Sequence, residues 1–555
     1  MREHKDSQVV RRTVFSSGYR LIEIGGLISL VCFWGWIGCG GGKGDSNAQH
    51  LPAAGTEIPP YPTTLTQTWK PLLPAVWLNY PDPATVPDLG VLIQSEGDPY
   101  LRRDDLGAGG SGTEARVSLL YFSHLSDIHL CDDESPMRMT NIDLPGPTQA
   151  AFRPQDNLSV QVLDAMIRTL NHFSNDRPFD FLMVTGDSID NDHWIEVRWL
   201  IDTFDGKIID PDTGADDDPI SGPANDYADP FLAWGLDPRV PWYTVIGNHD
   251  GLIQGNLSPT VNYDQTATGS EVFWGTRDGS TPEAGRIHNG RVPADPDRRL
   301  LGMNRSPRDF IEEFFQTSSL PVGHGFTPDG REQGYGYYSF NPVPEVPVRV
   351  IVLSTYNREE GLSEGSLDRD QFENFFIPEL DRARQEKELV IVASHHPPGN
   401  FLISEVSEEE FILTLFSFPN VFLHLVGHGH KNRIIPRMGA NPGEGYWEIE
   451  APSLMDYPQQ AHIMEIVNNG DGTGSVFSTV ADHNSPKGSL SYESRALSLM
   501  DVQTGGQEAG QEGDPEDRNV ELIFKIPSEM VDIVNQSAGS TRIESLTTLM
   551  VEQVN

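Results

Sequence analysis

Histidine and carboxylate side chains recur at short spacings at five places in this chain, and these residue types bind metal ions. In chain order the patterns are D-x-H from Asp127, G-D-x-x-D around Asp187, G-N-H-D around Asn248, H-H at His395 and G-H-G-H up to His430. Imidazole nitrogens and carboxylate oxygens together suit Mn, Fe or Zn. One D-x-H alone is weak, because an Asp and a His beside a strand end are ordinary solvated residues. Five such patterns in succession predict a metal centre.

Each pattern directly follows a short apolar run that is typical of a buried strand in a sheet covered on both faces. Residues two apart in an extended segment point the same way, so Asp127 and His129 can reach one ion beyond the first strand. A helical face from Val162 to Leu170 separates the first two strands and predicts a βαβ unit. The expected strands before the patterns are residues 117–122, 179–184, 242–246, 389–393 and 421–426, with further strands at 348–353 and 520–527.

In this order the five patterns resemble those of the calcineurin-like metallophosphoesterases. The resemblance covers about residues 116–483, and the segments DDESP (132–136) and PVGHGF (321–326) suggest a bacterial subgroup of the family. It implies an α/β fold, a two-sheet β-sandwich core flanked by helices in four layers (α/β/β/α). We therefore expect a metallophosphoesterase domain at 116–485, with an insertion at about 251–347.

The resemblance also implies how two metal ions are held. The implied ligands are Asp127, His129 and His430 for one ion, Asn248, His395 and His428 for the other, and Asp187 as the bridge. A carboxylate has two oxygens to share between two cations, and Asn offers a neutral carbonyl oxygen. The ions are expected to be divalent or trivalent Mn, Fe or Zn. Two ions about 3.5–4 Å apart can generate a hydroxide near neutral pH and clamp the oxygens of an in-line displacement.

His249 resembles the family's catalytic histidine, which protonates the departing oxygen or steadies the charge on it. Asp190 matches a position that orients that histidine in some members, and the alternative is that Asp190 caps the following helix.

Three residues are candidates for substrate contacts, namely His396, His324 and Arg305, and Asp250 is a candidate for a supporting role. Arg305 belongs to a basic patch with Arg298, Arg299 and Arg308. This patch is either a solvated surface or a phosphate-facing lid.

The function implied is that of a metal-dependent phosphoric ester hydrolase. It would cleave a phosphodiester or a phosphomonoester through a metal-bridging hydroxide, with a slight preference for the diester. The alternative is a non-catalytic, metal-containing envelope lipoprotein that binds a phosphorylated ligand. All seven implied ligands are present, which favours the enzyme.

The charge balance limits the partners. With 81 acidic and 39 basic residues the formal charge is −42, so bulk nucleic-acid binding is disfavoured. A small phosphate ester remains compatible, because bound cations dominate the local field. The oligomeric state is left open.

Residues 1–39 read as a signal peptide, with basic residues, an apolar run from Ile24 to Gly38 and then Cys39. Cys39 is a candidate lipidation site, so we expect a periplasmic or envelope-associated protein whose membrane contact is an N-terminal lipid anchor. An uncleaved anchor is the alternative. Cys131 is the only cysteine after Cys39, so no internal disulfide is expected. Residues 40–115 read as an extended arm, and residues 486–555 as a C-terminal extension, partly disordered, with 501–519 mobile.

Overall fold

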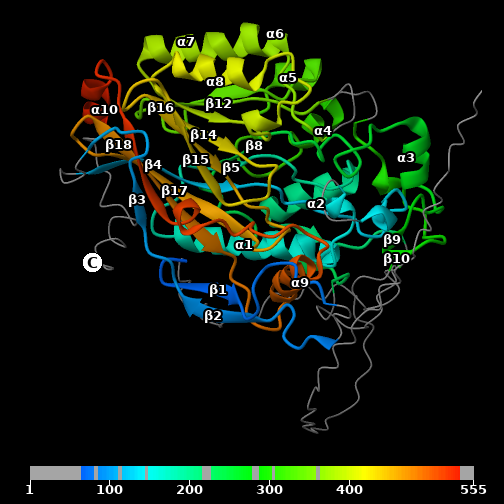
Figure 1. Ribbon diagram of the computed structural model, residues 1–555. Coiled ribbons are helices and arrows are strands. Elements are labelled where there is room, and N and C mark those ends of the chain that lie inside the picture. Colours follow the sequence, from blue (N-terminus) through cyan, green and yellow to red (C-terminus); the bar gives the residue numbers. More distant parts are fainter. Residues whose placement is uncertain are drawn as a thin grey trace, which may run out of the picture.

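The computed structural model describes residues 64–537, with gaps at 81–84, 111–115, 144–147, 215–226, 278–286, 303–306 and 358–362. Two mixed β-sheets lie face to face and helices cover both outer surfaces (Figure 1). This four-layer α/β arrangement confirms the predicted fold class.

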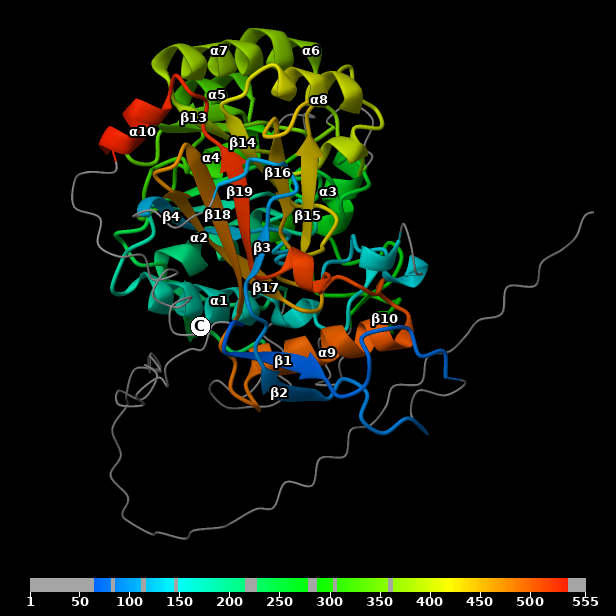
Figure 2. The same cartoon turned by 60° about the vertical axis from the view of Figure 1, so that its left-hand side comes forward.

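The first sheet has seven strands in the order β3-β19-β18-β17-β4-β5-β8. Its parallel part runs from β4 (Val117–Leu125) to β5 (Phe181–Val184) and β8 (Trp242–Thr244). Its other strands are β17 (Gln460–Asn468), β18 (Thr473–Asp482), β19 (Val520–Lys525) and β3 (Leu101–Arg103). Figure 2 shows β17, β18 and β19 side by side.

The second sheet has six strands in the order β11-β12-β13-β14-β16-β15. These are β11 (Tyr338–Phe340), β12 (Val348–Val352), β13 (Leu389–Ala393), β14 (Val421–Val426), β16 (Gly445–Glu450) and β15 (Arg433–Met438). Strands β12, β13, β14 and β16 are parallel. Every residue of β13 and β14 is buried, as expected for strands covered on both faces.

Helices α1 (Ser159–Ser174) and α2 (Trp194–Asp205) cover the seven-stranded sheet. The six-stranded sheet is covered by a continuous helical stretch made of α6 (Arg369–Gln371), a π-helical turn (Phe372–Phe376) and α7 (Ile377–Glu386), and by α8 (Glu408–Phe416). The largest apolar cluster joins both sheets and the inner faces of α1 and α2, and a second one joins the six-stranded sheet to α7 and α8.

The segment 251–347 contains α3 (Val261–Ala267), β9 (Thr276–Arg277), β10 (Ile287–His288), α4 (Arg308–Glu313), α5 (Pro328–Gln333) and β11. The short strands β6 (Ile208–Ile209) and β7 (Phe231–Leu232) pair with each other after α2.

The described part of the arm forms a hairpin of β1 (Gln67–Pro71) and β2 (Leu92–Glu96) that packs on α9 (Leu490–Thr504). Strands β3 and β19 lie outside the expected limits 116–485 and yet belong to the seven-stranded sheet. Helix α10 (Val531–Ser537) ends the described chain.

Residues 501–519 were expected to be mobile from their composition. In the structure their side chains at Asp501, Gln503, Gln507 and Gln511 are buried. Within residues 64–537 as described, no helix combines the length and the apolar character that crossing a membrane requires.

Candidate metal centre

All five polar patterns lie at one edge of the two facing sheets. They follow the carboxyl ends of β4, β5 and β8 in one sheet and of β13 and β14 in the other. These strands run parallel within each sheet, so the loops that leave them converge. The fold therefore brings together residues as far apart in the chain as Asp127 and His430.

One group of side chains surrounds Asp127. The Nε2 atom of His430 lies 3.1 Å from Oδ1 of Asp127 and 3.2 Å from Nε2 of His129. The same His129 nitrogen lies 4.0 Å from Oδ2 of Asp187. Two carboxylates and two imidazoles thus face one point.

A second group surrounds Asn248, whose Oδ1 lies 3.1 Å from Nε2 of His395 and 3.2 Å from Nδ1 of His428. Oδ2 of Asp187 lies 3.2 Å from Nε2 of His395, so Asp187 contacts both groups. Atoms that bind one cation at about 2.0–2.2 Å stand roughly 3 Å from one another. The donors and their separations therefore fit two neighbouring metal ions.

Three of these imidazoles are oriented through their outer nitrogen. Nδ1–H of His395 donates to the carbonyl of Thr185 over 2.7 Å, and Nδ1–H of His129 donates to Asp190 over 3.2 Å. Nδ1–H of His430 donates to the carboxylate of Asp456. Each of these hydrogen bonds keeps a proton on Nδ1 and turns Nε2 toward the cluster, where Nε2 can bind a metal ion once it carries no proton. Asp456 was missed by sequence reasoning, because it stands in the turn before β17 and belongs to no spaced pattern.

The backbone of this region is strained in a consistent way. Five of the implied ligands have left-handed φ values, which are 50° at Asp127, 47° at His129, 49° at Asp187, 71° at His428 and 57° at His430. Such values are uncommon outside glycine and cluster at functional sites. A Cβ at Gly427 would meet Ser126 and the Asp127 carboxylate, and a Cβ at Gly429 would meet Glu450. The close approach of these groups requires both glycines.

The buried carboxylates give the cluster a strong negative field. Burial raises the pKa of Asp127, but the neighbouring His430 outweighs this and lowers it to about 2. Burial lowers the pKa of His395, but Asp187 raises it to about 9, and Asp127 likewise raises that of His430 to about 10. In the protein alone, protons on these two imidazoles balance the carboxylates, and metal cations would replace them.

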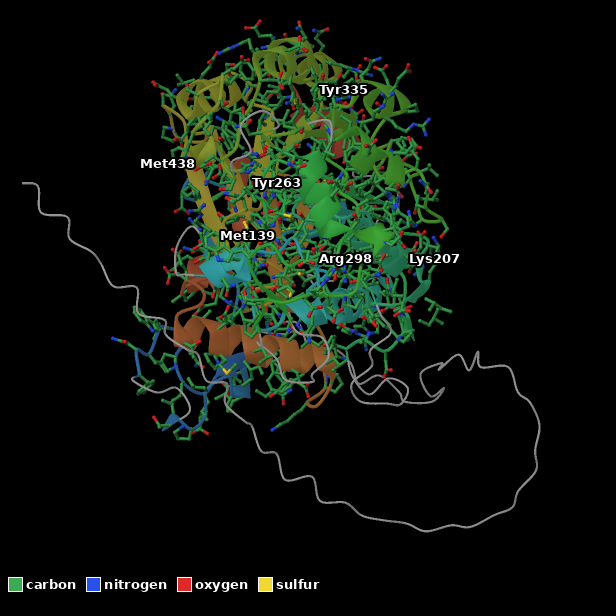
Figure 3. All side chains as sticks on the ribbon, turned by 90° about the vertical axis from the view of Figure 1, so that its right-hand side faces the viewer. Met139, Lys207, Tyr263, Arg298, Tyr335 and Met438 are labelled. Carbon is green, nitrogen blue, oxygen red and sulfur yellow. The ribbon has the colours of Figure 1, made fainter. Side chains whose placement is uncertain are left out.

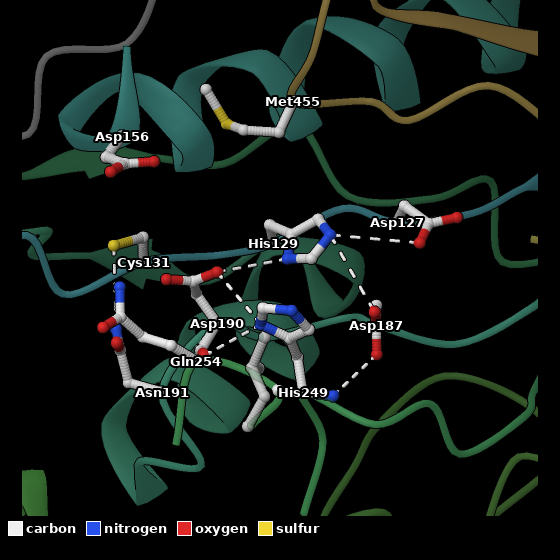
Figure 4. Close-up of polar contacts among 12 residues, drawn as sticks. Asp127, His129, Cys131, Asp156, Asp187, Asp190, Asn191, His249, Gln254 and Met455 are labelled. Atoms are coloured by element: carbon white, nitrogen blue, oxygen red, sulfur yellow. Dashed lines mark hydrogen bonds and ion pairs between the residues drawn. The ribbon is translucent and has the colours of Figure 1, made fainter. Parts of the chain in front are cut away.

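His249 lies beside this cluster and is paired with Asp190 (Figure 4). Its Nδ1–H donates to the Asp190 carbonyl over 3.1 Å and lies 3.2 Å from Oδ1 of that residue. Its backbone N–H donates to Oδ1 of Asp187 over 2.8 Å. The structure therefore has the orienting contact for Asp190. The capping alternative is wrong, since the N-cap of α2 is His193.

Asp250 ties two of the loops together. Its Oδ1 accepts from the backbone N–H of Ser188 over 2.8 Å, and its Oδ2 accepts from that of Gly247 over 2.8 Å. Asp250 supports the loops and does not face the cluster directly.

Of the candidate substrate contacts, His396 lies beside the cluster, with its ring centroid 4.4 Å from that of His428. Both its ring nitrogens are hydrogen bonded, to the Thr355 hydroxyl and the Ser363 carbonyl, each over 2.9 Å. These bonds hold the ring within the wall of the site.

His324 does not belong to the site, which corrects the prediction. Its ring stacks 3.6 Å from Trp242, and its Nδ1–H donates to the Trp242 carbonyl over 3.1 Å. Trp242 begins β8, whereas the cluster lies beyond the other end of that strand. His324 is a core histidine.

Arg305 lies outside the described residues. Arg298 of the same basic patch, which is labelled in Figure 3, is buried and pairs with Asp132 over 2.8 Å. It is therefore neither a solvated residue nor part of a lid.

The model of the calcineurin-like phosphoesterase family matches residues 120–432. Among solved structures, a dimetal phosphatase from Danio rerio is similar at 11% identity and a TM-score of 0.36, over 66% of this chain and 100% of that chain. The purple acid phosphatase PPD1 from yellow lupin (Lupinus luteus) seeds is similar at 11% identity and 0.33, over 82% and 60%. A 5'-nucleotidase from Candida albicans follows at 10% identity and 0.25, over 80% and 57%. No curated protein matches the sequence.

Proposed function

Since the chain belongs to the calcineurin-like phosphoesterase family and is a metal-dependent phosphoric ester hydrolase, we propose that its substrate is a small phosphodiester or phosphomonoester. We propose that the ester is cleaved at a binuclear metal centre. The observation that carries the proposal is the convergence of two donor groups on Asp187. The proposed ligands are Asp127, His129 and His430 for one ion, Asn248, His395 and His428 for the other, and Asp187 for both. Bound there, two divalent or trivalent ions such as Mn, Fe or Zn would supply Lewis acidity to water and to the phosphoryl oxygens.

His249 is the proposed proton donor. Asp190 fixes its Nδ1, so Nε2 is the ring atom left to act on a departing oxygen. The hydrogen bond from its backbone to Asp187 holds the histidine at a constant position relative to the proposed bridging ligand. A proton held in that place can be given to the leaving group as the ester bond breaks.

The charges around the site favour the diester. The buried Arg138 and Arg153 are already paired with Asp156, Asp190 and Asp456. A diester brings one negative charge to the metals, whereas a monoester near neutral pH brings nearly two. The second charge of a monoester would be stabilised by unpaired cations, and these two arginines are already paired with carboxylates. Arg305 lies outside the described residues and is not part of this charge argument, and we propose it as a further contact to the phosphate of either ester.

The test is hydrolysis of bis(p-nitrophenyl) phosphate and of p-nitrophenyl phosphate by the full chain, purified in detergent and reconstituted with Mn²⁺. We expect turnover with a higher rate on the diester. His249→Ala should retain two metal ions per chain and lose about 100- to 10,000-fold in rate, the usual contribution of a positioned acid. Asp187→Asn should lose both metal binding and activity. Loss of metal from His249→Ala would contradict the assigned roles.

A non-catalytic envelope protein that binds a phosphorylated ligand is the second candidate. This candidate would gain support if the purified protein held metal but turned over neither ester nor any of a panel of natural phosphate esters. Retention of phosphate on the metal-loaded protein would then identify it as a binding protein.

We also propose that this is a bacterial, exported protein held at the membrane by a lipid on Cys39, with a small phosphate ester as its partner. Residues 1–63 lie outside the described part of the chain. Labelling with a radioactive fatty acid tests this proposal. Wild type should incorporate label and Cys39→Ser should not, and equal labelling of both would refute the anchor.

A further inference from the structure

A fully buried arginine lies behind the candidate metal centre. Arg153 stands between two short 3₁₀ helices, Gln149–Ala151 and Asp156–Leu158, and has no exposed surface. Its Nε–H donates to Oδ1 of Asp456 over 2.7 Å, and its Nη1 lies 3.5 Å from Oδ1 of Asp190. One guanidinium thus bridges two buried carboxylates from different loops.

Both carboxylates hold histidines of the site. Asp456 accepts from Nδ1 of His430, while Asp190 accepts from Nδ1 of His129 and lies against Nδ1 of His249. Through these two aspartates, Arg153 is connected to two proposed ligands of the same ion and to the proposed proton donor.

The chemistry of the network requires a guanidinium. Burying carboxylates without a partner charge is unfavourable, and a planar fork with several donors can serve more than one of them. A lysine ammonium is a single point charge on a flexible stem. The backbone N–H of Arg153 also donates to Oδ2 of Asp156 over 3.0 Å, and Arg138 pairs with Asp156 and Asp190, which completes the network.

The charge effects agree with this geometry. Burial raises the pKa of Asp456, but Arg153 and then His430 hold it well below its ordinary value. Asp456 therefore stays ionised and keeps accepting from His430.

We propose that Arg153 is a positioning residue that holds Asp456 and Asp190, and so sets the orientation of His129, His430 and His249 together. The inference rests on the proposed metal centre and adds to it a distinction between the two ions. The ion bound by Asp127, His129 and His430 depends on Arg153. The ion bound by Asn248, His395 and His428 does not, because Nδ1 of His395 is held by the Thr185 carbonyl.

Arg153→Met is the main perturbation. Without the guanidinium, Asp456 and Asp190 lose their shared partner and the histidines in front of them lose a fixed orientation. Changing a group that contacts a metal ligand typically weakens metal binding by about 10- to 100-fold. Removing Arg153 disturbs two such groups, Asp456 and Asp190, at once. We expect that loss at one ion only, together with a lower kcat and a nearly unchanged KM.

Arg349→Met is the matched control. Arg349 is buried and pairs with Glu379, Glu386 and Glu388 at 3.1, 2.9 and 2.7 Å. It lies near the amino end of β12, whereas the cluster follows the carboxyl ends of the strands. This variant loses a buried arginine network of similar size without touching the site.

The experiment titrates Mn²⁺ into the metal-free full chain by calorimetry and follows the spin coupling of Mn²⁺ pairs by electron paramagnetic resonance. Wild type and Arg349→Met should bind two ions and give a coupled spectrum. Arg153→Met should bind one ion with the wild-type constant and the other 10- to 100-fold more weakly, so that at limiting Mn²⁺ the spectrum is uncoupled. Arg153→Lys keeps the positive charge, and its affinity for the weakened ion should lie between those of wild type and Arg153→Met. This variant keeps the test valid if Arg153→Met fails to fold.

The combined variant Arg153→Met with Asp456→Asn tests the route. If Arg153 acts through Asp456, the double variant should lose no more affinity for Mn²⁺ than the single variant with the larger loss. Two ions bound to Arg153→Met as in wild type, or equal weakening of both ions, would overturn the inference and leave the proposed function standing. A wild-type chain that binds no metal would instead overturn the proposed function, and the inference with it.

Discussion

Replacing Gly427 with alanine is expected to disable metal binding through a single methyl group. A Cβ built at this position lies 2.7 Å from Oδ2 of Asp127 and still closer to the Ser126 hydroxyl. Ordinary contacts of this kind begin at about 3.4 Å, so the carboxylate must move by roughly 0.7 Å. Metal ligands tolerate about 0.2 Å. The Asp127 carboxylate cannot turn away freely, because it accepts from the His428 N–H over 3.0 Å.

From this displacement we expect Gly427→Ala to lose about 10- to 100-fold in affinity for Mn²⁺, the usual effect of disturbing how a ligand is held. Calorimetric titration of the metal-free protein measures it. Gly399→Ala is the matched control, since it also lies in a loop that follows a site histidine. Its Cβ would meet only the Glu408 carboxylate, at an ordinary 3.7 Å. Wild-type affinity in Gly427→Ala, or an equal loss in Gly399→Ala, would refute the reasoning.

Three further outcomes are expected. Removing bound metal with a chelator should lower the melting temperature. The reason is that a ligand present at 100 times its dissociation constant stabilises the folded state by about 2.7 kcal/mol. An unchanged melting temperature would speak against a metal centre. His324→Ala should lower the free energy of unfolding by about 2–4 kcal/mol, because it empties the space beside Trp242. Activity assays normalised to folded protein should show unchanged turnover. Burial raises the pKa of Asp205, but the N–H of Ser318 and then Lys207 outweigh this and lower it to about 2, against 3.8 unfolded. After allowance for solvent screening, that carboxylate stabilises the fold by about 1–2 kcal/mol above pH 4, and the contribution falls by about half at pH 3 and is lost below pH 2. Melting curves of wild type and Asp205→Asn should therefore converge on acidification, and a gap as large at pH 3 as at pH 7 would contradict this.

The strands could be predicted because their signal is local. Residues 389–393 and 421–426 are the exact limits of β13 and β14, since both are continuous apolar runs bounded by polar residues. Strand β8 ends at Thr244, two residues before the predicted limit of 246, where the chain turns toward Asn248. The spaced patterns also placed the seven proposed ligands at one edge of the sheets, and their role as ligands stays a prediction.

The network behind the site could not be predicted, because it depends on contacts between distant residues. Arg153 and Asp456 are 303 positions apart and neither belongs to a spaced pattern. The role of His324 could not be predicted either, because it depends on burial and on stacking against Trp242, which is 82 positions away in the chain.

The left-handed backbone at five proposed ligands lowers the stability of the fold at the residues that are needed to bind metal. A residue with a side chain held in a sparsely populated φ region costs about 1–3 kcal/mol, and glycine would remove much of that strain. Glycine at Asp187 or His428 is thus expected to relax the metal-free fold while removing a donor. Selection for stability alone would therefore erode this site first, and an engineered thermostable variant has to leave these loops as they are.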